Sequence, residues 1–152
     1  MRRFLALAAA GILAVLLISC GREGFDPGTM EPSPVTEPGE KVTMRLTEDR
    51  FDRFPEELNL VITNHTSAEY NYGVDYRLEV ELDGGWYVVE PTEDMMFIAL
   101  GVILPADAIN SESLNLAEGY RDLPEGRYRL VKSFYGEGTS TEATAEFLVQ
   151  AA

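Results

Sequence analysis

The residue types that could carry covalent or acid–base chemistry are scarce in this chain, which holds a single cysteine, Cys20, and a single histidine, His65. Nucleophilic catalysis needs a nucleophile, a base and a third group that orients the base. His65 lies in the turn-like stretch TNHTSAEYN, where a lone histidine is usually solvated, although a triad built on it stays open. The chain also lacks the G-x-S-x-G, H-E-x-x-H and glycine-rich phosphate-loop motifs. We therefore assign no catalytic residue.

The 26 acidic side chains could in principle support glycoside hydrolysis or metal binding, but carboxylate pairs arise by chance at this density. Two acidic stretches, TEDRFD at 47–52 and EPTED at 90–94, are candidates for a calcium loop because Ca²⁺ takes oxygen ligands. Neither matches a known loop, and Arg50 places a positive charge within the first. We therefore assign no metal and no cofactor. The glycosylation sequon that begins at Asn64 is interpreted as incidental.

The first part of the chain has the layout of a secretory signal peptide. Arg2 and Arg3 precede an apolar run at 4–18, which is 15 residues long. A membrane-spanning helix needs roughly 20 apolar residues, whereas a signal peptide needs a charged start, a shorter apolar run and a small residue before the cut. We predict a signal peptide over residues 1–19; a short uncleaved anchor helix is the alternative.

The residues around the cysteine carry more information. Leu17-Ile18-Ser19-Cys20 resembles the lipobox of bacterial lipoproteins. The resemblance implies lipid attachment at Cys20, with acyl chains such as palmitate, after cleavage makes it the new N-terminus. Two or more acyl chains give stable membrane anchoring. The expected location is the extracytoplasmic face of the cell membrane; an unmodified thiol behind an ordinary signal peptide is the alternative.

Charge and cysteine content limit the partners of the mature chain. Removal of Arg2 and Arg3 leaves ten basic against 26 acidic side chains, a formal charge of −16. Phosphate backbones and anionic lipid headgroups repel such a chain, so we expect no nucleic acid partner and membrane contact only through the lipid. With one cysteine, no intramolecular disulfide can form, so packing alone must stabilise the fold.

Residues 21–40 contain four prolines, four glycines and five acids, with only Phe25, Met30 and Val35 large and apolar. Such a segment buries too little surface to offset its conformational entropy. We therefore predict that residues 20–40 are the lipidated cysteine followed by a disordered tether, and that residues 41–150 form one domain.

A period of two runs through the domain and predicts strands, because strands expose alternate side chains to opposite faces. The clearest stretch is 72–83, followed by a hairpin turn at Asp83-Gly84 and a return strand at 85–89. The continuous apolar run at 95–103 predicts a buried strand, and 105–111 a loop. Further strands are expected at 42–46, 58–62, 114–116, 127–135 and 142–149. Seven or eight short antiparallel strands indicate an all-β sandwich or barrel.

One local pattern favours the sandwich. LPEGRYRL at 123–130 resembles the tyrosine corner of immunoglobulin-like domains, with Leu130 where an antibody domain has its second cysteine. Together with YGVDYRLEVELDGGWYVV at 72–89, this stretch makes residues 41–149 similar to bacterial Ig-like domains of unassigned role. The resemblance implies an immunoglobulin-like antiparallel β-sandwich without its disulfide, and it implies no activity.

The functional hypothesis that follows is a non-catalytic binding or accessory module, monomeric, whose partner is another envelope protein or a wall polymer. Tyr70, Tyr72 and Tyr135 flank two loops that would share one end of the sandwich with the start of the first strand, and these loops would face the membrane. The alternative is a small extracytoplasmic hydrolase or metal-dependent enzyme, which needs carboxylates that converge in a pocket.

Overall fold

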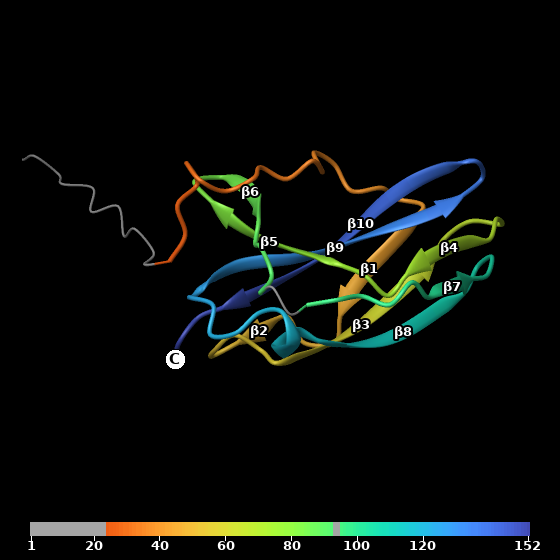
Figure 1. The fold of residues 1–152 in the computed structure, drawn as a ribbon. Helices are drawn as coiled ribbons and strands as arrows, with labels where there is room; N and C mark the ends of the chain where they lie inside the picture. Colours follow the sequence, from red (N-terminus) through yellow and green to blue (C-terminus); the bar gives the residue numbers. More distant parts are fainter. Residues whose placement is uncertain (1–23, 93–94) are drawn as a thin grey trace, which may run out of the picture.

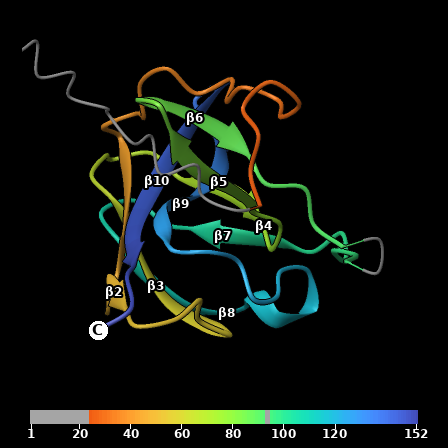
Figure 2. The same ribbon diagram turned by 90° about the vertical axis from the view of Figure 1, so that its left-hand side faces the viewer.

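The computed structural model describes residues 24–92 and 95–152, which form two β-sheets packed face to face (Figure 1, Figure 2). The expected all-β, immunoglobulin-like sandwich is confirmed, with ten strands instead of seven or eight. The elements are β1 Val42–Leu46, β2 Arg50–Phe51, β3 Glu57–Asn64, β4 Tyr70–Gly73, β5 Arg77–Leu82, β6 Gly85–Val88, β7 Gly101–Leu104, β8 Ile109–Asn115, the 3-10 helix η1 Leu116–Glu118, β9 Gly126–Gly136 and β10 Thr139–Val149.

The two sheets differ in size. The smaller sheet has the order β1-β3-β8. The larger has the order β2-β10-β9-β4-β7, and β5 and β6 continue it from β9. The chain passes from one sheet to the other between β1, which pairs with β3, and β2, which runs parallel to β10. On the opposite side, β8 and β7 are both end strands.

The alternating apolar residues meet between the sheets, as predicted. The stretches expected at 42–46, 58–62, 127–135 and 142–149 are strands that bury their apolar faces. Leu130, in the place of the missing cysteine, is fully buried. Residues on the inner faces of both sheets therefore stabilise the sandwich by burial alone. The fully buried side chains include Leu58, Leu60, Ile62, Leu78, Leu104, Tyr128, Phe134 and Phe147.

The predicted strand at 72–83 is divided into β4 and β5, and both pair with β9. Five residue steps lead from Tyr72 to Arg77, whereas their partners Phe134 and Val131 are three steps apart. The two extra residues bulge out of the pairing, which breaks the strand. The turn after β5 is as predicted: Asp83 and Gly84 have φ of 51° and 80°, the left-handed values of a tight hairpin.

The prediction of a buried strand over residues 95–103 is wrong. Only Gly101–Leu104 is a strand, and Met96, Ile98 and Leu100 are exposed. A continuous apolar run carries no period that would distinguish a buried strand from an exposed loop. The loop expected at 105–111 is shorter than predicted, because β8 begins at Ile109 and takes in Leu114.

The prediction of a disordered tether is wrong for residues 24–40, which we call the strap. The strap runs along the outside of the larger sheet (Figure 1). It extends the sheet at β6, where the amide of Ser33 donates to the carbonyl of Trp86 and the amide of Val88 donates to that of Glu31. Its large apolar residues, Phe25, Met30 and Val35, pack against the domain. Composition did not indicate this packing, because it shows only that large apolar residues are few in this segment and not that each of them contacts the domain.

A buried cluster of charges lies under the strap. Glu79 points to the outer face of β5 and is 0% exposed. Its carboxylate binds Arg129 Nε at 2.7 Å and Arg77 Nε at 2.8 Å, and accepts a hydrogen bond from the Ser33 hydroxyl at 2.7 Å. Arg129 also donates to the Ser33 hydroxyl and the Val35 carbonyl. The strap therefore supplies part of the polar shell that a buried charge requires.

The strap reverses the expected orientation of the domain. The loops near Tyr70 and Tyr135 do share an end with the start of β1, where Lys41 pairs with Glu137 at 2.8 Å. The strap, however, runs from that end back to the other, where Phe25 contacts Tyr128 at 6.4 Å between ring centroids. The described chain therefore begins at the end opposite to those loops, so the assumption that the preceding chain leaves the domain beside them is wrong.

The tyrosine corner is formed as predicted. The hydroxyl of Tyr128 donates to the carbonyl of Pro124, and its ring stacks on Phe147 at 5.4 Å between centroids. The phenol thus joins the start of β9 to the chain that leads into it, at the end of the domain where Ala151 also lies through its bond to Glu125. This end is called the corner end below.

We predict that Glu79→Ala lowers the free energy of unfolding by about 3–5 kcal/mol, because Arg129 is then left buried without its carboxylate. Glu81→Ala on the same strand is the matched control. Glu81 pairs with Arg127 near the surface, so its loss should cost at most about 1 kcal/mol. Urea unfolding of both variants measures the difference, and equal losses would contradict a structural role for the buried carboxylate.

We predict that Tyr128→Phe lowers the free energy of unfolding by about 1 kcal/mol through loss of the hydrogen bond to Pro124. Tyr135→Phe is the control, since Tyr135 is 57% exposed and its change should lie within about 0.5 kcal/mol. A lower urea midpoint with an unchanged slope would be the expected result for Tyr128→Phe. An unchanged midpoint would show that the corner does not contribute to stability.

Candidate functional site

The two residues that opened the search for chemistry do not form a catalytic site in the described residues. Cys20 lies outside them. His65 binds the hydroxyl of Thr43 through its Nε2 at 2.7 Å on the surface of the smaller sheet. In residues 24–92 and 95–152 no carboxylate is bonded to the other nitrogen of the ring, so the base and orienting group of a triad are not assembled there.

The sequon is structural. Asn64 is buried, and its side-chain amide donates to the carbonyls of Ala68 and Pro105 at 2.7 and 2.8 Å. Its carboxamide oxygen accepts hydrogen bonds from the backbone and hydroxyl of Thr66. The side chain therefore shapes the turn after β3 and is not presented for modification.

The aromatic residues singled out near the loops divide into buried and exposed ones. Tyr70 and Tyr72 face the core, whereas Tyr135 is exposed. Burial raises the pKa of Tyr70, with a smaller contribution from its hydrogen bond to Glu137. Hydrogen bonds from Lys41 and Tyr70 lower the pKa of Glu137. This loop end is thus fastened by polar contacts, and it offers one exposed aromatic side chain among those predicted.

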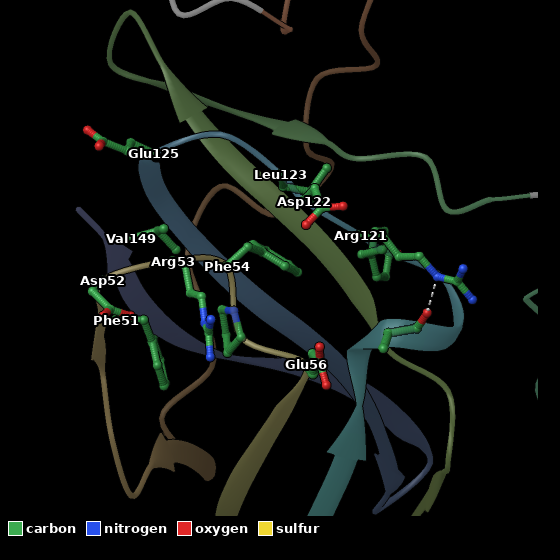
Figure 3. Close-up of a pocket in the computed structure, with 13 residues that line it drawn as sticks. Phe51, Asp52, Arg53, Phe54, Glu56, Arg121, Asp122, Leu123, Glu125 and Val149 are labelled. Carbon is green, nitrogen blue, oxygen red and sulfur yellow. Dashed lines mark hydrogen bonds between the residues drawn. The ribbon is translucent and has the colours of Figure 1, made fainter. Parts of the chain in front are cut away.

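A hollow lies at the corner end, between the β2–β3 connection and the chain that leads into β9 (Figure 3). It has a volume of about 990 Å³. Phe51, Phe54 and Leu123 give it apolar walls. Its charged lining residues come from different segments and are Asp52, Arg53, Glu56, Arg121, Asp122 and Glu125.

These charged groups do not converge on one point. In Figure 3, Glu125 points away from the hollow on one side and the guanidinium of Arg121 on the other, where Arg121 Nε donates to the carbonyl of Ala117. Burial raises the pKa of Tyr120 to about 12, so this phenol stays protonated near neutral pH. Across the described residues, no three His, Cys, Asp or Glu side chains are placed to hold a metal ion. Residues 93–94 of the acidic stretch at 90–94 lie outside the described residues.

A second region lies along β8, whose outer edge is open. The amide of Asn64 donates to the carbonyl of Ala108 across the β3–β8 pairing. Backbone groups in an antiparallel pair alternate in direction, so even-numbered residues of β8 bind β3. Ser111 and Ser113 therefore point their N–H and C=O groups away from β3. In the part of the chain that the structure describes, these groups have no backbone partner.

A groove of about 330 Å³ runs beside this edge. Ser113 and Leu114 of β8 line one side of it. Tyr76 and Phe97 line the other side, with their ring centroids 5.2 Å apart. Met95 also lines the groove and would touch any side chain placed at Gly119. The groove therefore joins an unpaired strand edge to an apolar wall.

Exposed apolar side chains lie on residues 96–100, which lead from the groove into β7, and on β7 and β8 themselves. Phe97 is 41% exposed, Ile98 72% and Met96 86%. Leu100, Ile103 and Ile109 are also more than half exposed. Single exposed apolar residues are ordinary, but neighbouring ones in this number are typical of interaction surfaces. We call Met96, Phe97, Ile98, Leu100, Ile103 and Ile109 the apolar rim.

A buried ion pair lies behind the groove, between the two sheets. Lys132 is 2% exposed and its Nζ lies 3.2 Å from Glu112 Oε2. The ammonium also lies 5.4 Å from the ring centroid of Tyr72. Glu112 lines the groove. The Oε2 atom of Glu112 is buried with the ammonium that balances it, so Glu118 is the exposed acid at the groove. Composition alone did not indicate this pair, because a lysine on a strand is usually solvated.

No helix in residues 24–92 and 95–152 combines the length and the hydropathy that spanning a bilayer requires.

Two solved structures are similar to this chain at low identity. Among solved structures, the periplasmic chaperone SfaE is similar at 12% identity and a TM-score of 0.42, over 72% of this chain and 56% of that one. The alkylpurine DNA glycosylase AlkC of Pseudomonas fluorescens, bound to DNA with an abasic site analogue, is similar at 17% identity and a TM-score of 0.37, over 74% and 31%. This chain therefore spans less than two thirds of either.

A comparison with curated proteins finds no significant match. The model of the bacterial Ig-like domain matches residues 38–148, which agrees with the sheets described above. A domain of this family suggests a binding or accessory module. On this match and this fold, the chain belongs to the bacterial Ig-like domain family.

Proposed function

We propose that this protein is a lipid-anchored module on the extracytoplasmic face of a bacterial cell membrane, where its Ig-like domain binds another envelope protein and does no chemistry. The observation that carries the binding role is the apolar rim. The mature chain has a formal charge of −16 and therefore a strongly polar surface. Exposed Met, Phe, Ile and Leu side chains on such a surface are typical of a site that contacts another molecule. An apolar surface favours a protein partner over a hydrophilic wall polymer.

The lipid anchor is proposed from the sequence around Cys20. The position of the strap indicates which end of the domain would lie near that anchor. Four residue steps separate Cys20 from Gly24, a span of at most about 14 Å. A Cβ placed on Gly24 would lie 3.6 Å from Pro124, at the corner end. With a lipid on Cys20, the corner end would face the membrane. The β9–β10 hairpin would then point away from it, and the apolar rim would lie on the side of the domain.

We predict that the wild-type protein incorporates a clickable palmitate analogue and sediments with membranes, and that Cys20→Ser abolishes both. Ser19→Ala is the matched control, because it keeps a small residue before the cysteine and should leave labelling intact. Fractionation of cells with in-gel fluorescence measures both properties. A wild-type protein without label would contradict the anchor.

We predict that a photo-cross-linking amino acid at Ile98 traps one defined envelope protein in living cells. The same amino acid at Arg45, an exposed position on the smaller sheet, is the control and should trap none. Equal adducts from both positions, or none from Ile98, would contradict binding through the apolar rim.

A further inference from the structure

The outer edge of β8 is open in a way that strand edges in proteins seldom are. Soluble proteins protect such edges with proline, lysine, bulges or very short strands. β8 is seven residues long and its sequence, INSESLN, contains neither proline nor lysine. By contrast, β2 and β7 are short, and the strap covers β6. Among the strands that end a sheet in the described residues, β8 is the longest, and its outer edge lies beside the apolar groove.

An added strand would find both kinds of contact that strand addition requires. The outward N–H and C=O groups of Ser111 and Ser113 can bind the main chain of an extended peptide. Tyr76 and Phe97 offer a surface for its alternate apolar side chains. The small side chains of the two serines leave the edge accessible. Backbone pairing would give affinity, and the groove would select the side chains.

The charge at the groove indicates what the peptide carries. Glu112 and Glu118 line it, while the cation that balances Glu112 is buried behind it. A basic side chain on the incoming strand would meet the exposed Glu118, because Lys132 already balances the carboxylate of Glu112. A second copy of this chain would instead bring its own Glu118, and like charges that face each other are unfavourable. The occupant is thus another protein, and self-association is disfavoured.

We infer that the edge of β8 from Ile109 to Ser113, with its groove, accepts an extended segment of a partner protein in which apolar and basic residues alternate, as a fourth strand of the smaller sheet. The edge ends there because the outward carbonyl of Asn115 already accepts a hydrogen bond from the Tyr76 hydroxyl. This inference rests on the proposed function and specifies the chemistry of its partner. The apolar rim would border the bound strand and exclude water from it.

The test uses the full lipidated protein in nanodiscs and a blocked peptide in which valine and lysine alternate over about eight residues, an ordinary strand length. A second peptide has glutamate in place of lysine. We predict that the lysine peptide slows hydrogen exchange at Ser111 and Ser113 and that the glutamate peptide does not. Equal protection by both peptides, or protection by neither, would overturn the inference.

A pair of variants isolates the strand edge. Ser113→Pro removes an N–H that β3 does not use, whereas Ser113→Ala keeps it. We predict that Ser113→Pro weakens binding of the lysine peptide by at least about tenfold and that Ser113→Ala binds as the wild type does. Thermal unfolding shows whether Ser113→Pro folds. If it does not, Glu118→Lys serves as the second variant, and it should weaken binding of the lysine peptide at low salt.

The outcomes separate this inference from the proposed function. Adducts at Ile98 together with unchanged peptide binding by folded Ser113→Pro and by Glu118→Lys would keep the binding module and overturn strand addition. A wild-type dimer in sedimentation experiments that Ser113→Pro abolishes would also overturn the inference, because the edge would then bind a second copy. Loss of the Ile98 adducts with intact peptide binding would instead count against the proposed partner surface.

Discussion

The carboxylate of Glu79 is the constraint on which the arrangement of this molecule depends. It is fully buried on the outer face of a sheet, where a strand would ordinarily present it to water. A charge removed from water is tolerated only when other charges and hydrogen-bond donors surround it. Arg77 and Arg129 supply the charges, and Ser33 of the strap supplies a hydroxyl. The strap has to lie over β5 for this shell to be complete.

The course of the strap then determines at which end of the domain the described chain begins. Because residues 24–40 run back along the larger sheet, the described chain begins beside the tyrosine corner and Ala151 lies there as well. The hollow of about 990 Å³ is at the same end. The β9–β10 hairpin, fastened by Lys41 and Glu137, is at the other. A domain without a disulfide thus gains a second layer of packing from a segment whose composition is that of a linker.

The open side of the sandwich has a different physical basis. β1 and β2 lie on one side of the sandwich, whereas β7 and β8, on the other side, are joined by residues 105–108 and by a hydrogen bond from Asn110 to Ile103 but leave the rest of the β8 edge open. The buried Lys132–Glu112 pair sits behind that opening. A buried pair of this kind gives little net stability but is strongly unfavourable to break, so it fixes the position of Glu112 at the groove. The surface that results has exposed apolar side chains and one exposed acid, Glu118, at the groove.

The sequence by itself determined the fold class, the tyrosine corner and the Asp83-Gly84 hairpin, because a period of two, turn residues and corner residues act over a few positions. It also indicated most of the core, since alternation assigns side chains to faces. Only the tertiary structure decided that residues 24–40 pack, that residues 96–100 are exposed and that Glu79 and Lys132 are buried. Each of these depends on what lies across the sheet or beside the strand, and neighbours distant in the chain leave no mark on local spacing. The open edge of β8 could not be predicted from the sequence either, because only the fold shows that no strand pairs with it on that side.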